Sequence, residues 1–116
     1  MHKQISIIGA GSWGTALAIH LAGNFNQISL WVYEKELCES MTCTGENPWF
    51  LPGHPLPDNI HPTTSLKDAV KGQPIVLLVV PTHAIRQTLF KIKPYIAKDC
   101  LVINASKGIE NDTLLT

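Results

Sequence analysis

The chain has 116 residues, 45% of them hydrophobic and 16% charged, so it can bury one core but is too short for two domains of ordinary size. Nine Lys and Arg residues balance nine Asp and Glu residues, without a basic run or a basic patch interleaved with aromatic residues. This pattern indicates neither a nucleic-acid-binding surface nor a polybasic membrane patch. We therefore expect a single domain that holds any anionic ligand locally.

The N-terminal residues run directly into an apolar strand, which leaves no room for a signal peptide. No apolar stretch approaches the roughly 20 residues that a transmembrane helix needs. The three cysteines lack the C-x-x-C spacing of zinc and redox sites, and the five histidines are scattered. We expect a cytoplasmic protein with reduced thiols, no metal site and no membrane partner.

The first predicted strand, residues 5–8, leads into the pattern G-x-G-x-x-G at residues 9–14. In a βαβ unit Gly9 permits the tight turn, Gly11 lets the backbone approach phosphates, and Gly14 lets the next helix pack closely on the strand. The helix N-terminus then offers free N–H groups and a partial positive charge to a pyrophosphate. Taken alone, the pattern is equally compatible with a simple tight β-to-α connection.

An Ala- and Leu-rich helix is expected next, buried against the sheet and ended by a Gly23-Asn24 cap. A second strand at residues 28–33 ends at Glu34, 20 residues after Gly14. At this offset an acidic side chain can accept hydrogen bonds from an adenosine ribose. The alternative is a solvated residue that opens the next helix. The combined features favour dinucleotide binding.

Residues 35–41 can form a short helix with Leu37 and Met41 on one face, because these two residues are four apart. Residues 44–62 show no periodicity and are rich in proline and glycine. These residues favour turns and extended backbone, so the segment is predicted to be a loop.

Ser65-x-x-Asp68 has the form of a capping box and predicts a short helix that ends at Gly72. The uninterrupted apolar run at residues 75–80 is typical of a central parallel strand covered on both faces, and Pro81 ends it.

Ile85, Leu89 and Ile92 have the i, i+4, i+7 spacing of the inner face of a helix, which Pro94 ends. The last predicted strand covers residues 101–104.

The alternation of strands and helices predicts an α/β fold with a doubly wound parallel sheet of the Rossmann type. Ligands of such sheets bind at the carboxyl ends of the strands. The candidate site residues are therefore those that follow each strand: residues 9–14, Tyr33 and Glu34, Pro81, Thr82 and His83, and Ser106, Lys107 and Gly108.

Five segments carry a more specific pattern: GAGSWGT at residues 9–15, LWVYE at 30–34, NPWFLPG at 47–53 followed by Leu56-Pro57, VVP at 79–81, and SKGIE at 106–110. Together they resemble the N-terminal part of the NAD(P)-dependent sn-glycerol-3-phosphate dehydrogenases. The tryptophan of the glycine loop and the Phe-Leu-Pro-Gly loop distinguish this family from ketopantoate, prephenate and 6-phosphogluconate dehydrogenases. The resemblance covers essentially the whole chain.

The resemblance implies NAD or NADP as the cofactor. Ser12 and Trp13 would contact its pyrophosphate and ribose region, and Tyr33 would lie near its adenosine. Lys107 would lie beside nicotinamide and substrate, where an ammonium can neutralise a phosphate or polarise the carbonyl that receives hydride. The alternatives are simple ring packing for Trp13 and an exposed loop lysine for Lys107. The predicted cofactor-binding residues are Gly9, Gly11, Ser12, Trp13, Gly14, Tyr33, Glu34, Pro81 and Lys107, and Lys107 is the predicted catalytic residue.

The resemblance further implies interconversion of dihydroxyacetone phosphate and sn-glycerol 3-phosphate, supply of glycerophospholipid precursors, and a homodimeric full-length enzyme. In this family the general-acid/base lysine and the residues that grip the substrate come from a C-terminal helical domain, so we expect residues 1–116 to be only the N-terminal NAD(P)-binding domain, incomplete at its C-terminus and inactive alone. The alternative is a non-catalytic dinucleotide-binding module. Glu34 favours NAD by repelling a 2′-phosphate, whereas neighbouring Lys35 leaves NADP open.

Overall fold

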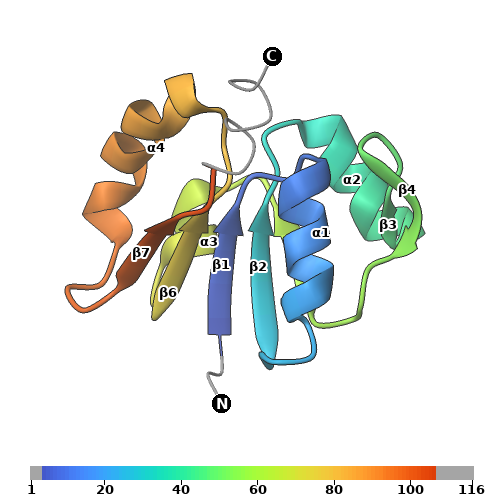
Figure 1. Ribbon diagram of the computed structural model, residues 1–116, viewed down its shortest axis with the longest axis horizontal. Helices are drawn as coiled ribbons and strands as arrows, with labels where there is room; N and C mark the ends of the chain where they lie inside the picture. The colour runs from blue at the N-terminus through green and yellow to red at the C-terminus, as the bar shows by residue number, and fades with distance from the viewer. Residues whose placement is uncertain (1–3, 107–116) are drawn as a thin grey trace.

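The computed structural model describes residues 4–106, in which five parallel strands form the main sheet. These strands are β1 (Gln4–Ile8), β2 (Gln27–Trp31), β5 (Ile60–Thr63), β6 (Ile75–Leu78) and β7 (Leu101–Asn104), and their order in the sheet is β5-β2-β1-β6-β7 (Figure 1). The helices are α1 (Ser12–Leu21), α2 (Lys35–Thr44), α3 (Leu66–Val70) and α4 (Ile85–Ile92), with short 3-10 turns at Thr82–Ala84 and Lys93–Tyr95. The strand order reverses at β1, which therefore lies at the topological switch point.

Helices cover both faces of this sheet. Successive residues of a strand point to opposite faces, so Ile7 of β1 packs with α1 and α2, whereas Ile8 packs with α3 and α4. Figure 1 shows α1 and α2 on the β2 side of β1, and α4 on the side of β6 and β7. The two resulting apolar clusters confirm the predicted doubly wound α/β fold of the Rossmann type.

Several local predictions are confirmed. The hydroxyl of Ser65 accepts a hydrogen bond of 3.1 Å from the N–H of Asp68 at the start of α3, and Gly72 follows this helix with a left-handed φ of +72°. Leu37 and Met41 are the buried face of α2. The strands β2 and β6 each end two residues before their predicted limits.

The prediction of a loop over residues 44–62 is wrong in part. The segment contains a small antiparallel pair, β3 (Glu46–Asn47) and β4 (Leu51–Pro55), and it runs into β5 at the edge of the main sheet. Antiparallel pairs this short have no detectable alternation, which explains why periodicity did not reveal them.

Pro62 concealed β5, because proline cannot donate a backbone hydrogen bond to a neighbouring strand. The N–H groups of Ile28 and Val32 donate to the carbonyls of Asn59 and Thr63, both at 2.8 Å. Parallel ladders bond alternate residues, so Pro62 lies between the bonded positions and its nitrogen faces the free edge of the sheet. Pro62 therefore removes no backbone hydrogen bond between β2 and β5.

The predicted Gly23-Asn24 cap of the first helix is also wrong. The helix α1 ends at Leu21, its cap is Ala22 in a right-handed conformation, and Gly23 does not adopt a positive φ. The amide of Asn59 donates hydrogen bonds to the carbonyls of Ala22 (2.8 Å) and Phe25 (2.9 Å). In a glycine cap, carbonyls at the helix end accept hydrogen bonds from nearby backbone N–H groups. Here a side chain distant in sequence donates these hydrogen bonds instead.

The inner face of α4 differs from the predicted spacing. Ile92 is buried and Ile85 packs against the core, but Leu89 is 38% exposed. Thr88 takes the buried position instead.

Candidate functional site

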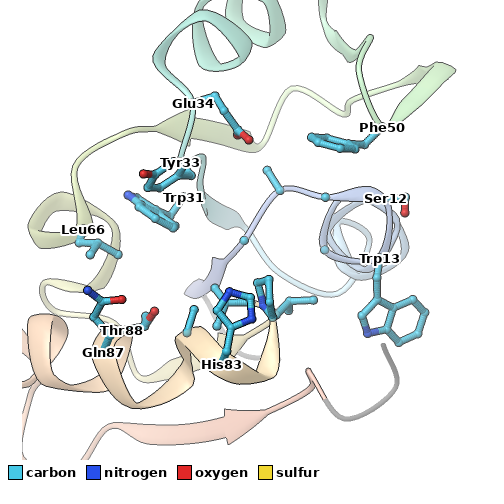
Figure 2. A pocket seen from close by; sticks show the side chains of 18 of the residues that line it. Ser12, Trp13, Trp31, Tyr33, Glu34, Phe50, Leu66, His83, Gln87 and Thr88 are labelled. Carbon is cyan, nitrogen blue, oxygen red and sulfur yellow. The ribbon is translucent and has the colours of Figure 1, made fainter. Parts of the chain in front are cut away.

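A cavity of about 1110 Å³ opens at the carboxyl ends of the strands, above the switch point at β1 and β6 (Figure 2). This volume slightly exceeds the roughly 300–1,000 Å³ that is usual for ligand-binding pockets. Its walls come from the glycine loop, the end of β2, the β3–β4 turn, α3, the end of β6 and α4. The lining residues are Gly9, Ala10, Gly11, Ser12, Trp13, Gly14, Trp31, Tyr33, Glu34, Phe50, Leu66, Val79, Val80, Pro81, His83, Ala84, Gln87, Thr88 and Lys91.

Three glycines of the motif line the cavity floor, and the structural reason for a glycine differs at each position. Gly9 has a φ of +126°, and a Cβ there would lie 2.2 Å from the carbonyl oxygen of Val79. A Cβ on Gly14 would lie 2.0 Å from the carbonyl oxygen of Gly9, so α1 packs directly on the backbone that leaves β1. A Cβ on Gly11 would meet nothing within 4 Å. The fold therefore requires Gly9 and Gly14, whereas Gly11 keeps space open in the cavity.

The N-terminus of α1 is suited to an anion. Gly11 is the N-cap and provides no side-chain hydrogen bond, and the first turn carries no acidic residue. The first N–H groups of any α-helix lack partners within the helix, and the helix dipole adds partial positive charge there. This end of α1 borders the cavity and can hold a phosphate group.

Ser12 and Trp13 lie on α1 at one side of the cavity, and both are exposed (Figure 2). The indole Nε1 of Trp13 donates a hydrogen bond of 3.1 Å to the carbonyl of Ala105, directly after β7. Trp13 is therefore more than a packed apolar ring: it connects the glycine-loop helix with the end of the last described strand.

The end of β2 forms the aromatic wall of the cavity. Tyr33 is 77% exposed and makes an edge-on contact with Trp31, with 6.0 Å between ring centroids. The indole Nε1 of Trp31 is anchored by a hydrogen bond of 2.9 Å to the carbonyl of Thr64. Glu34 is the N-cap residue of α2, but its side chain does not cap that helix and lines the cavity. Glu34 thus opens α2 and also borders the cavity, and its contact with an adenosine ribose stays a prediction.

One wall of the cavity was missed by sequence reasoning. It is a stripe on and just before α4 with the spacing i, i+3, i+4, i+7, formed by Ala84, Gln87, Thr88 and Lys91. Figure 2 shows Gln87 and Thr88 on this helix, across the cavity from Glu34. In the sequence, the signal for this wall was a mostly polar stripe beside the apolar face of the predicted helix.

The β3–β4 turn supplies a second missed wall. Phe50 is 42% exposed and lines the cavity on the same side as Glu34 (Figure 2). The completely buried amide of Asn47 connects this turn to the glycine loop, through hydrogen bonds to the carbonyl of Ala10 (2.8 Å) and the hydroxyl of Thr15 (2.9 Å). Both Phe50 and Asn47 belong to the segment NPWFLPG, which resembles the dehydrogenase family, but the sequence alone predicts no role for either residue.

The ends of β6 and β7 meet beside the cavity. Pro81 lines the cavity, as predicted from its position after β6. The hydroxyl of buried Ser106 donates to the carbonyl of Leu78 and accepts from the N–H of Val80, each at 2.9 Å, so it joins the two strand ends. Lys107 follows immediately and lies outside the described residues.

Within residues 4–106 no helix is long and apolar enough to cross a membrane, and no group of three or more His, Cys, Asp or Glu residues could hold a metal ion. The three cysteines are free thiols. Burial raises the pKa of the Cys38 and Cys100 thiols, and the neighbouring carboxylates of Glu39 and Asp99 raise it further. A raised pKa disfavours the thiolate form of both cysteines.

A family model described as NAD-dependent glycerol-3-phosphate dehydrogenase N-terminus matches residues 4–116. The chain belongs to this family. A glycerol-3-phosphate dehydrogenase, NAD(P)+, from Desulfotalea psychrophila is 47% identical over 113 residues, which are 97% of this chain and 33% of that protein. A protein of the same name from Moorella thermoacetica is 45% identical over 113 residues, with 97% and 34% covered.

Solved structures of the same family agree with the fold. The glycerol-3-phosphate dehydrogenase from Coxiella burnetii superposes with a TM-score of 0.83 at 35% identity, covering 88% of this chain and 31% of that chain. The resemblance to glycerol-3-phosphate dehydrogenases is thus confirmed. The chain spans about a third of the length of the curated relatives it matches.

Proposed function

We propose that this chain binds NAD(H) or NADP(H) in the cavity at the switch point, as the cofactor-binding domain of an enzyme that interconverts dihydroxyacetone phosphate and sn-glycerol 3-phosphate. Membership in the dehydrogenase family supports the reaction. The observation that carries the binding is the open cavity at the N-terminus of α1, bordered by Gly11.

The described residues fit a dinucleotide in three respects. The space above Gly11 admits a ligand close to the backbone, and the helix N-terminus there favours a pyrophosphate. Trp31 and Tyr33 offer aromatic surface, and Glu34 offers a carboxylate to ribose hydroxyls. Ser12, Trp13 and Pro81 border the same cavity and complete the proposed cofactor contacts.

A bound nicotinamide would supply hydride transfer. The residues of this chain would hold the cofactor, fix its orientation across the switch point and exclude water from part of it. Lys107 is proposed to face nicotinamide and substrate, where its ammonium would stabilise charge on the reacting oxygen or on the substrate phosphate. We also propose that the full-length enzyme is a homodimer and supplies precursors of glycerophospholipids.

A turnover assay with dihydroxyacetone phosphate and NADH tests this function. We expect the 116-residue chain to bind NADH weakly and to show no turnover, because two-domain dehydrogenases complete their site only when a second domain encloses the substrate. Calorimetric titration measures the binding. Strong turnover by this chain would show that the substrate-binding half has been misplaced, whereas absence of binding would refute the proposed function.

The same assay on an enzyme that joins this segment to a substrate domain tests Lys107 and separates the enzyme from a non-catalytic binding module. There, Lys107→Ala should lower kcat/KM for dihydroxyacetone phosphate at least about 100-fold, the size expected when one charge-stabilising group is lost. Affinity for the adenine end of the cofactor should stay within about twofold of the wild-type value. Wild-type rates in the variant would make Lys107 a loop residue without a catalytic role.

We propose NAD as the preferred cofactor, because the carboxylate of Glu34 would repel a 2′-phosphate. In Glu34→Ser, the affinity for NADP relative to NAD should rise about tenfold, equivalent to about 1.4 kcal/mol. Competitive titration of the two dinucleotides measures this ratio. Glu36→Ser is the matched control, since Glu36 is an exposed acid in the first turn of α2 outside the cavity lining. Equal ratios in both variants would contradict the role of Glu34.

A further inference from the structure

The side chain of Asn47 is completely buried and uses its full hydrogen-bonding capacity. Its Nδ2 donates to the carbonyl of Ala10 at 2.8 Å and to the hydroxyl of Thr15 at 2.9 Å. Its Oδ1 accepts from the N–H groups of Trp49 at 3.2 Å and Phe50 at 3.0 Å. A side-chain amide has two donor hydrogens and two acceptor lone pairs, so all four are used.

These four bonds join two walls of the cavity that are far apart in sequence. Ala10 lies inside the glycine loop, and Thr15 is in the first turn of α1. Trp49 and Phe50 form the turn between β3 and β4, and Phe50 lines the cavity. The strand β3 has only two residues, and the four hydrogen bonds of Asn47 connect the turn that follows it to the glycine loop.

The bond to Ala10 determines the direction of a peptide group at the proposed phosphate site. The hydroxyl of Thr15 donates a second hydrogen bond to the same carbonyl, at 3.3 Å. This carbonyl therefore points into the buried region that holds Asn47 and Thr15. The peptide between Ala10 and Gly11 is trans, and a trans peptide directs its C=O and its N–H in opposite directions.

The N–H of Gly11 is consequently directed away from Asn47. Among residues 4–106 no group accepts a hydrogen bond from this N–H. Gly11 itself borders the cavity with open space above it. A backbone N–H held in this way is a preorganised donor for an anionic oxygen.

We propose that Asn47 is a positioning residue for dinucleotide binding: it directs the Gly11 N–H toward the pyrophosphate. This inference rests on the proposed function, because it assumes that the pyrophosphate lies above Gly11. Asn47 does not line the cavity, so it acts only through the groups that it holds.

Titration of the 116-residue chain with NADH, ADP and adenosine tests the role of Asn47. In Asn47→Ala, the Kd for NADH and for ADP should rise at least about tenfold, the effect of losing one well-oriented hydrogen bond to a charged group. The Kd for adenosine, which carries no phosphate, should change by less than about twofold. A merely structural residue would lower the melting temperature without this difference between ligands, so all titrations are made where circular dichroism shows a folded chain.

Asn59→Ala is the matched control. Asn59 likewise donates two hydrogen bonds, both to backbone carbonyls, but at the end of α1 remote from the glycine loop, and it does not line the cavity. Its variant should lose stability and keep the wild-type Kd for NADH. If Asn47→Ala does not fold, Thr15→Val removes a second donor to the Ala10 carbonyl, and a Kd for ADP about threefold above wild type is expected.

The outcomes separate this inference from the proposed function. A wild-type chain that does not bind NADH overturns the proposed function and the inference with it. A wild-type chain that binds NADH, together with a folded Asn47→Ala or Thr15→Val variant of unchanged Kd for ADP, overturns the inference alone. Selective loss of NADH and ADP affinity in these variants, with Asn59→Ala unaffected, supports it.

Discussion

Gly11→Val is expected to abolish dinucleotide binding while the chain stays folded. A Cβ at this position meets nothing within 4 Å, and the backbone φ of −71° is one that valine adopts readily. The added branched side chain would occupy the space where the pyrophosphate is proposed to approach the backbone. We expect the Kd for NADH to rise at least about 100-fold, which corresponds to roughly 3 kcal/mol.

Calorimetric titration measures this loss, and thermal melting checks that the fold is retained. Gly23→Val is a suitable control, because Gly23 also has open space around it and lies outside the cavity lining. It should bind NADH as the wild type does. Unchanged NADH affinity in a folded Gly11→Val variant would refute the placement of the pyrophosphate.

Gly14→Ala, unlike Gly11→Val, should destabilise the fold itself. Its Cβ would lie 2.0 Å from the carbonyl oxygen and 2.9 Å from the carbonyl carbon of Gly9, and backbone atoms cannot rotate away as a side chain can. Alanine in a helix normally gains about 1 kcal/mol over glycine, so any net loss measures the steric clash. We expect a net loss of about 2 to 3 kcal/mol, which lowers Tm by roughly 10 to 20 °C.

Urea unfolding followed by circular dichroism gives this loss. Gly11→Ala provides the comparison, since it adds the same methyl group one turn earlier into open space, and it should be close to wild type in stability. Equal stability of Gly14→Ala and wild type would mean that α1 does not pack on the Gly9 backbone as described.

Features encoded within a few consecutive residues could be predicted from the sequence. The glycine loop, the Ser65 capping box and the apolar run of β6 each follow from local rules of turns, caps and burial. The rule that ligands bind at the carboxyl ends of parallel strands then placed Glu34 and Pro81 at the cavity. Lys107 was placed by the same rule, and the described residues do not test it.

Features that depend on partners distant in sequence could not be predicted. Asn47 lies 37 residues from Ala10, inside a segment whose prolines and glycines conceal any periodicity. Thr88 replaces Leu89 on the inner face of α4 because the cavity and the core meet along that helix. The edge strand β5 was hidden for a related reason, since a proline is compatible with a strand only where one side is unpaired.

The position of Pro62 also bears on how the chain behaves at high concentration. The unpaired edge of a sheet presents a row of N–H and C=O groups on which a strand of another molecule can assemble. Because the nitrogen of Pro62 faces that edge and carries no hydrogen, the row on β5 lacks a donor at this position. A strand from a second molecule would find an interrupted ladder there, so the proline that disguises β5 in the sequence also protects this edge against aggregation.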